Sequence, residues 1–399
     1  MSKSLLSRKL QNMSESATIL MAQKARDLKS KGFDVISLSL GEPDFDTPDY
    51  IKEAAKKALD NGHTKYTPVP GLIELREAIC NKLKRDNNLE YKPSQIVVSN
   101  GAKQSIANIC LALLDEGDEV IIFTPYWVSY FEIVKFAGGT PVPVYAGIED
   151  EYKVKPEQLT AAITNKTKLI IYSSPSNPTG SVYTQSELDA LAKVITGQKD
   201  IFVMSDEIYE YINFSTKNPS IANCDGMYDK TIIVNGMSKG FAMTGWRLGY
   251  MAAPEWISKA CAKVQGQFTS GANAFGQQAA ITALSENPVK QDYMKEKYAE
   301  RKHLAKSLLD QIDGIKSNDP QGAFYFFPNV KDLFGRSNGE RTINNADDLV
   351  DILLTEAHVG TVTGMAFGDP NSIRLSYATS NERLIEALTR IKDTLGSYK

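Results

Sequence analysis

Six short apolar runs, mostly separated by helix-like segments, constrain the fold of this chain more than any other feature of its 399 residues. Most of them do not alternate between apolar and polar residues, which is typical of strands buried on both faces. Strands of this kind, separated by helices, predict an α/β fold in which helices flank a mainly parallel sheet. Ligands of such folds bind at the carboxyl ends of the strands, so we expect the functional residues in the loops there. The runs are residues 96–99, 119–123, 168–174, 201–205, 231–234 and 249–253.

The chain beyond about residue 290 has a different character. It begins with a long charged helix and later contains an alternating strand at 372–378, which together predict a second, smaller α+β domain. We expect a large domain over residues 46–295 and a small domain built from both termini, residues 1–45 and 296–399. No internal repeat and no glycine-serine tether separates the two parts, so we expect them to pack rigidly with a binding cleft between them.

The composition argues against several classes of protein. A net charge of -3 and the lack of any Lys- or Arg-rich block exclude the electrostatic footprint of a nucleic-acid binder. No run has the length that crosses a bilayer, and the first residues lack the apolar core of a signal peptide. We therefore expect a soluble, cytoplasmic protein with neither nucleic acid nor membrane as a partner. With three histidines and four scattered cysteines, we also expect no metal site.

The loop after the strand at 231–234 carries the strongest chemical signal. It consists of small residues around Lys239, and Arg247 follows eight positions later. A lysine in a partly desolvated site loses its proton readily and can then attack a carbonyl carbon, while an arginine can hold a phosphate. The alternative is a solvated loop lysine, which describes most lysines, so this loop needs partners elsewhere in the chain.

Four further segments place polar groups where a ligand could bind. Gly101 and Ala102 open a helix, where backbone N–H groups bind anions, although a plain helix cap would look the same. Asn177 lies in a turn fixed by two prolines and a glycine, which is either a rigid hydrogen-bond donor or an Asx turn. Asp206 ends a wholly apolar strand, so it either meets a cation or caps a helix. Arg374 alternates with apolar residues in a strand and could either fork onto a carboxylate or lie exposed at an edge.

Five motifs in this order and spacing resemble the class I pyridoxal-phosphate aminotransferases. The similarity runs from about Gly41 to the C-terminus and is strongest to the bacterial and plant branch of aspartate aminotransferases, some of which also accept prephenate. It implies the fold of the type I pyridoxal-phosphate transferases, with a seven-stranded sheet in the large domain. The motifs are Gly101-Ala-Lys-Gln, Pro175-Ser-Asn-Pro-Thr-Gly, Ser205-Asp-Glu-Ile-Tyr, Ser238-Lys-Gly-Phe followed by Gly245-Trp-Arg-Leu-Gly, and Ile373-Arg-Leu-Ser-Tyr-Ala.

The resemblance assigns roles toward pyridoxal 5'-phosphate. Lys239 is expected to bind the cofactor covalently and to act as general base and acid. Asp206 is expected to pair with the pyridine nitrogen, and Asn177 and Tyr209 to hydrogen-bond the phenolic oxygen. Many relatives carry a hydroxyl three residues before the lysine, but this chain has Gly236. The expected phosphate ligands are the backbone of Gly101, Ala102 and Lys103, the side chains of Ser238 and Arg247, and Tyr66 of the partner subunit.

The resemblance also assigns the substrate contacts. Arg374 is expected to bind the α-carboxylate, and Lys103 and Thr18 the side-chain carboxylate of aspartate or glutamate. Because Tyr66 would reach across to the neighbouring active site, the resemblance implies a homodimer with shared sites. The resemblance further implies that Trp127 stacks on the pyridine ring and borders the substrate. Asn177 is also expected to border the substrate, and Gly41 to leave a backbone amide open beside it.

The expected reaction is transamination between aspartate or glutamate and 2-oxoglutarate or oxaloacetate, through a pyridoxamine phosphate form, with prephenate as a further candidate substrate. Other enzymes on the same scaffold remain alternatives, namely an aromatic or kynurenine aminotransferase or a carbon-sulfur β-lyase. A non-catalytic regulator would not need the full set of site residues. A dehydrogenase is disfavoured because no strand is followed by Gly-x-Gly-x-x-Gly with an acid at the expected distance.

Overall fold

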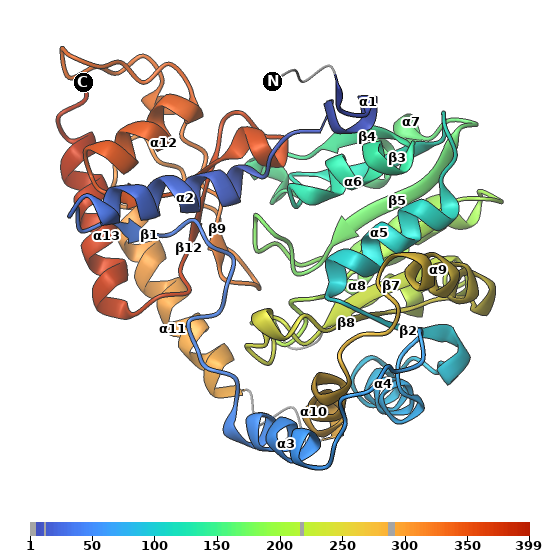
Figure 1. Ribbon diagram of the computed structural model, residues 1–399. Helices are drawn as coiled ribbons and strands as arrows, with labels where there is room; N and C mark the ends of the chain where they lie inside the picture. Colours follow the sequence, from blue (N-terminus) through green and yellow to red (C-terminus); the bar gives the residue numbers. More distant parts are fainter. Residues whose placement is uncertain (1–4, 12, 216–218, 286–291) are drawn as a thin grey trace.

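The computed structural model describes residues 5–11, 13–215, 219–285 and 292–399, and a seven-stranded sheet forms its centre (Figure 1). The strand order is β2-β8-β7-β6-β5-β3-β4, and every neighbouring pair is parallel except those of β8, which runs antiparallel to β2 and β7. This confirms the α/β fold with a mainly parallel sheet. The strands are β2 (Ile96–Ser99), β3 (Glu119–Thr124), β4 (Thr140–Tyr145), β5 (Thr167–Ser173), β6 (Phe202–Asp206), β7 (Thr231–Gly236) and β8 (Gly249–Ala252).

Helices cover both faces of the sheet, which explains why its strands are mostly apolar. In β3, Val120 and Ile122 pack into the core on one face while Ile121 and Phe123 pack into the core on the other. One face is covered by α5 (Ala102–Leu113), α6 (Ser129–Ala137) and α9 (Glu255–Phe268). The other is covered by α7 (Pro156–Ala162) and α8 (Gln185–Thr196), and near β2 by α3 (Asp49–Asp60), α4 (Ile73–Asn87) and α10 (Ala274–Ser285).

β4 is the strand of the seven-stranded sheet that the sequence pattern did not indicate. Its sequence, Thr-Pro-Val-Pro-Val-Tyr, contains Pro141 and Pro143, which are unfavourable in a central strand because they donate no ladder hydrogen bond. β4 lies at the edge of the sheet and pairs only with β3, so its prolines are tolerated there.

A second core joins the two ends of the chain. β1 (Ile36–Ser37) pairs in parallel with β10 (Val359–Gly360), and a separate antiparallel sheet has the order β11-β12-β9. Its strands are β9 (Tyr325–Phe326), β11 (Val362–Thr363) and β12 (Ile373–Ser376). The surrounding helices are α2 (Ala17–Ser30), α11 (Asp292–Leu309), α12 (Ala346–Thr355) and α13 (Asn381–Leu395). The short helix α1 (Arg8–Gln11) lies against α6 instead.

The division into a large domain, residues 46–295, and a small domain built from residues 1–45 and 296–399 stays a prediction. The predicted start of the charged helix at Lys290 lies outside the described residues, and α11 is seen from Asp292. Within the described ranges, no helix is long and apolar enough to cross a membrane.

Candidate active site

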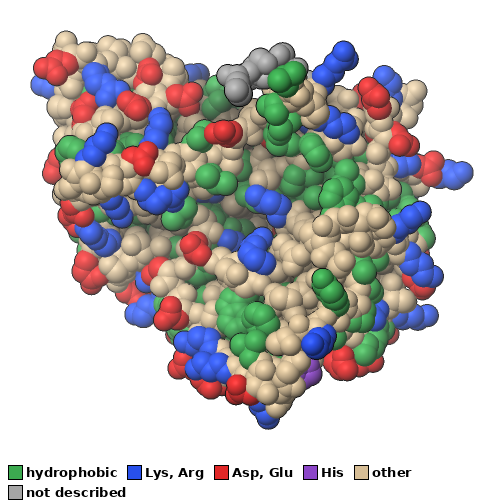
Figure 2. Space-filling view, in the orientation of Figure 1, with side chains coloured by type: hydrophobic (Ala, Val, Ile, Leu, Met, Phe, Trp, Pro, Cys, Tyr) green, Lys and Arg blue, Asp and Glu red, His purple; other side chains and the backbone are tan. Residues whose placement is uncertain are grey.

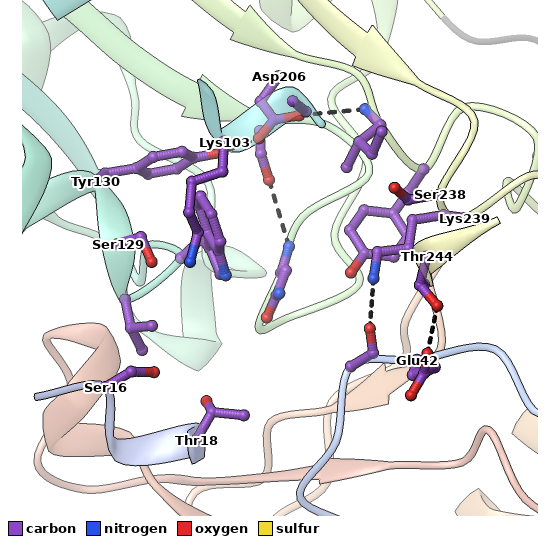
Figure 3. A pocket seen from close by; sticks show the side chains of 18 of the residues that line it. Ser16, Thr18, Glu42, Lys103, Ser129, Tyr130, Asp206, Ser238, Lys239 and Thr244 are labelled. Carbon is purple, nitrogen blue, oxygen red and sulfur yellow. Dashed lines mark hydrogen bonds between the residues drawn. The ribbon is translucent and has the colours of Figure 1, made fainter. Parts of the chain in front are cut away.

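The predicted site residues meet in a cavity of about 350 Å³ at the carboxyl ends of the parallel strands. Figure 2 shows Lys and Arg side chains near the hollowed middle of the face seen in Figure 1, beside hydrophobic patches. Residues from β6, from the loop after β7, from the start of α5 and from the N-terminal segment converge there (Figure 3). The predicted residues that line the cavity are Thr18, Gly41, Ala102, Lys103, Trp127, Asn177, Asp206, Tyr209, Ser238, Lys239, Arg247 and Arg374.

Asp206 is the last residue of β6, and its carboxylate is almost completely buried, with 5% of the residue exposed. Its Oδ2 accepts a hydrogen bond from the hydroxyl of Tyr130 at 2.5 Å, and its Oδ1 accepts one from the N–H of Ile208 at 3.2 Å. Residues 207–215 contain no helix, so Asp206 is not a helix cap. Burial raises the pKa of Asp206 to about 6, although both hydrogen bonds act in the opposite direction. Such a buried acid is suited to face a cation.

Lys239 follows β7, and its amine points into the cavity (Figure 3). Nζ donates a hydrogen bond to the carbonyl oxygen of Gly41 and lies 5.8 Å from the centre of the Tyr209 ring. Burial lowers the pKa of Lys239 to about 8, against the attraction of Glu42. An amine with this pKa is partly neutral near physiological pH and can act as a nucleophile.

Arg374 lies in β12 and is buried, with 1% of the residue exposed. One terminal nitrogen donates to Oδ1 of Asn177 at 2.9 Å, and the other donates to the carbonyl oxygen of Ser39 at 2.6 Å. Its Nε is buried without a hydrogen-bond partner, and no carboxylate in the described part of the chain forms an ion pair with the guanidinium. A buried cation with an unused donor is a receptor for a carboxylate.

An anion-binding corner lies where α5 begins. Gly101 has a φ of +81°, and a Cβ at this position would lie 3.0 Å from Cζ of Arg247 and nearer still to a terminal nitrogen. Arg247 is oriented by hydrogen bonds to the carbonyl oxygens of Thr244 at 2.9 Å and Asn100 at 3.4 Å. The free N–H groups of the first turn of α5 therefore lie beside a guanidinium, which is the arrangement that binds phosphate. Ser238 lines the same cavity.

Lys103 extends from α5 over Trp127, with Nζ 4.9 Å from the ring centre. Burial, and then the charge of Arg247, lower the pKa of Lys103. Figure 3 shows Lys103 directed toward the N-terminal segment that carries Ser16 and Thr18. This end of the cavity therefore offers a cation and hydroxyl groups to a ligand.

Two further positions that the sequence analysis singled out are Tyr66 and Gly236. Tyr66 is fully exposed and does not line the cavity within this chain. At Gly236, a Cβ would lie 2.8 Å from Cα of Gly249 and 2.8 Å from the carbonyl oxygen of Leu248. The close approach of β8 thus leaves no room for the hydroxyl that many relatives carry there.

Sequence reasoning missed two tyrosines of the site. Tyr325 lines the cavity, and its hydroxyl lies 2.7 Å from that of Tyr209. A Cβ at Gly41 would lie 3.5 Å from Cζ of Tyr325 and would overlap its hydroxyl, so this tyrosine explains the need for glycine. Tyr130 lies three residues after Trp127 and contacts Asp206. Both stand in segments that the sequence pointed to, but nothing local shows where their hydroxyls point.

The comparison with known proteins identifies the family. The model for aminotransferase class I and II matches residues 34–391, which is most of the chain. The chain belongs to this family. The aminotransferase predicted from the five motifs is thereby confirmed. In the described segments, no cluster of three or more His, Cys, Asp and Glu side chains could hold a metal ion in this aminotransferase.

Curated relatives and solved structures are similar over nearly the full length of this aminotransferase. It is 46% identical to the aspartate aminotransferase of Bacillus subtilis over 389 residues, covering 97% of this chain and 98% of that protein. It is 45% identical to the aspartate/prephenate aminotransferase of Cereibacter sphaeroides over 391 residues, covering 97% and 98%. The structure of the aspartate aminotransferase from Rhizobium meliloti superposes with a TM-score of 0.96 at 37% identity, covering 99% of both chains. That of the Thermus thermophilus aspartate aminotransferase with maleate superposes with a TM-score of 0.92 at 40% identity, covering 98% and 99%.

Proposed function

We propose that this aminotransferase uses pyridoxal 5'-phosphate to move an amino group between aspartate or glutamate and 2-oxoglutarate or oxaloacetate. The observation that carries the proposal is that a nucleophilic amine, Lys239, shares one cavity with two further cations, Arg374 and Lys103. Neither Arg374 nor Lys103 is paired with a carboxylate of the described chain. Two carboxylate receptors in one cavity suit a dicarboxylic amino acid.

The residues of the cavity fit the cofactor that the family implies. When bound, the cofactor supplies an aldehyde and an electron-withdrawing ring. The start of α5 would hold the phosphate together with Gly101. A side chain at Gly101 would overlap Arg247, so glycine suits this position. Asp206 would hold a proton at the ring nitrogen, because no cation among the described residues hydrogen-bonds to its buried carboxylate.

Lys239 would bind the cofactor aldehyde covalently through Nζ. After release by the substrate amine, the same Nζ would take the proton from Cα of the substrate and return a proton to the cofactor. Its lowered pKa supports this role, because a fully protonated lysine could not accept a proton. Asn177 and Tyr209 would orient the ring through its phenolic oxygen, and Trp127 would exclude water from one ring face.

Arg374 would bind the α-carboxylate through its unused Nε donor together with a terminal nitrogen. The amide of Asn177, which already accepts from Arg374, fixes the plane of the guanidinium and borders the substrate. Lys103 and Thr18 would bind the carboxylate of the substrate side chain, and Gly41 would leave its backbone amide open beside the substrate. The names of the Cereibacter relative and of others support prephenate as a further acceptor.

We further propose a cytoplasmic homodimer with shared active sites. The fully exposed ring of Tyr66 would reach the phosphate in the partner subunit. A second cavity of about 940 Å³ adjoins the first, and three exposed hydrophobic side chains border it, those of Phe136, Phe268 and Met365. A partner surface would cover them. All four cysteines are free thiols, as suits a reducing compartment.

The proposed chemistry is tested by loading the purified protein with pyridoxal phosphate and reducing it with borohydride. Peptide mapping should find the reduced cofactor attached to Lys239. A protein that stays colourless and carries no attached cofactor would refute the proposal. A panel of amino donors and keto acceptors, including prephenate, should then show keto acid formed together with an aminated acceptor. Pyruvate with free ammonia would instead identify a carbon-sulfur β-lyase.

Shared sites are tested by mixing two variants, Lys239→Ala, which should be inactive, and Tyr66→Phe, which should bind the cofactor more weakly. One hybrid site would carry both intact residues, so subunit exchange should restore part of the cofactor affinity that Tyr66→Phe loses. Hybrids that gain nothing over the separate variants would place Tyr66 outside the partner's site.

A further inference from the structure

The carboxylate of Asp206 is held in place by a residue that none of the five motifs contains. Tyr130 is 1% exposed, and its hydroxyl donates to Oδ2 of Asp206 across 76 positions of sequence. We propose that Tyr130 is a positioning residue, whose hydrogen bond orients Asp206 toward the ring nitrogen of the cofactor and keeps the shared proton on that nitrogen. This inference rests on the proposed function.

The hydroxyl of Tyr130 has no substitute near Oδ2. In the part of the chain that the structure describes, Asp206 has one other hydrogen-bond donor, the N–H of Ile208, and that donor contacts Oδ1. Lys239 acts on Asp206 only through its charge. The carboxylate is thus fixed at Oδ1 by its own backbone turn and at Oδ2 by Tyr130, and loss of either contact would allow it to rotate.

The position of Tyr130 is itself well determined. It lies in the first turn of α6, and its ring contacts the Trp127 ring edge-on, with centres 5.4 Å apart and planes at 80°. Figure 3 shows the Tyr130 ring reaching from this segment toward Asp206. One short segment therefore supplies both an aromatic wall of the cavity and the support of its buried acid. The spacing of three residues places both rings on one side of the helix start.

Removal of the hydroxyl has a predictable direction. A hydrogen bond donated to a carboxylate stabilises its charged form, so its loss makes the carboxylate a stronger proton acceptor. The proton between Asp206 and the ring nitrogen then moves toward Asp206, and the free carboxylate can also turn away. Both effects leave the ring nitrogen less protonated, which weakens the electron-withdrawing action of the ring.

The test compares the holoenzymes of wild type, Tyr130→Phe and Tyr172→Phe, each loaded with pyridoxal phosphate labelled with ¹⁵N in the ring. Tyr172 is the matched control, because it is also buried and its hydroxyl accepts a hydrogen bond from Ser205, the neighbour of Asp206, at 2.9 Å. Tyr172 packs on the opposite face of the sheet from Tyr130. Both changes remove one hydroxyl and one buried hydrogen bond, and thermal unfolding checks that both variants fold.

In Tyr130→Phe, we expect the ring ¹⁵N resonance to move toward that of neutral pyridine and the cofactor dissociation constant to rise about tenfold. We expect kcat for aspartate to fall about tenfold while KM stays within about twofold, because no substrate contact is lost. Tyr172→Phe should keep the wild-type resonance, affinity and kcat.

Equal ¹⁵N shifts in both variants, or a wild-type resonance in Tyr130→Phe, would overturn the positioning role and leave only a packing role. A wild-type protein that binds no pyridoxal phosphate would instead refute the proposed function. The two failures are therefore distinguishable.

Discussion

The substitution Gly101→Ala tests the anion-binding corner most directly. Gly101 has φ +81° and ψ 158°, a conformation that residues with a side chain rarely adopt, and it precedes the first turn of α5. An alanine Cβ would overlap the guanidinium of Arg247, which is the flexible end of a side chain and can move aside. The backbone strain should therefore reduce stability, while the displaced Arg247 should reduce cofactor binding.

The two effects have different magnitudes. Strain in this region of φ and ψ costs about 1–3 kcal/mol of folding free energy. Displacing Arg247 removes charge-assisted hydrogen bonds to the cofactor phosphate, each worth about 1.5–3 kcal/mol. Since 1.4 kcal/mol corresponds to a factor of ten, the dissociation constant for pyridoxal phosphate should rise about 10- to 100-fold.

Gly117→Ala is the matched control. Gly117 also has a positive φ, +97°, but a Cβ there would meet no atom within 4 Å. Urea unfolding of the cofactor-free proteins should show a loss of stability in both variants, whereas absorbance titration with pyridoxal phosphate should show weaker binding only in Gly101→Ala. If Gly101→Ala binds the cofactor as tightly as wild type, or Gly117→Ala loses as much affinity, the reasoning is wrong.

Three further predictions concern the charged residues of the cavity. Burial raises the pKa of Asp206 from 3.8 to about 6, so its charged form opposes folding once the pH rises through this range. Asp206→Asn should therefore raise the unfolding free energy of the cofactor-free protein at pH 7 by up to about 3 kcal/mol. A gain in unfolding free energy that persists undiminished at pH 4 would contradict this. Lys103→Ala should raise KM for aspartate about tenfold or more but change KM for an aromatic amino acid much less, and equal losses in steady-state kinetics would remove Lys103 from side-chain recognition. Arg374→Lys should lower kcat/KM about 100-fold for every amino donor, because the two-donor contact of the guanidinium with the α-carboxylate and its hydrogen bond to Asn177 are lost together. A loss confined to dicarboxylic donors would argue against binding of the α-carboxylate by Arg374.

Much of the fold follows from local sequence. The sequence predicts strands β2, β3, β5, β6, β7 and β8 to within a residue or two, because a strand covered by helices on both faces is apolar at most positions. The sequence does not predict β4, because its two prolines are acceptable only at the edge of a sheet. Whether a strand lies at an edge is decided by the assembled sheet. The motif residues were found because their types and spacing are set by the chemistry that they perform.

Only the tertiary structure decided how these residues act on one another. The contact between Tyr130 and Asp206 spans 76 positions, that between Tyr209 and Tyr325 spans 116, and that between Arg374 and Ser39 spans 335. Hydrogen-bond partners so far apart are chosen by packing, and no local pattern encodes them. The same holds for the pKa values of Lys239 and Asp206, because desolvation is the largest cause of both shifts. The sequence determined which chemical groups are present. Burial in the folded chain determined their charge and orientation, because a side chain that is surrounded by water keeps its ordinary pKa and rotates freely, and only packing removes that water.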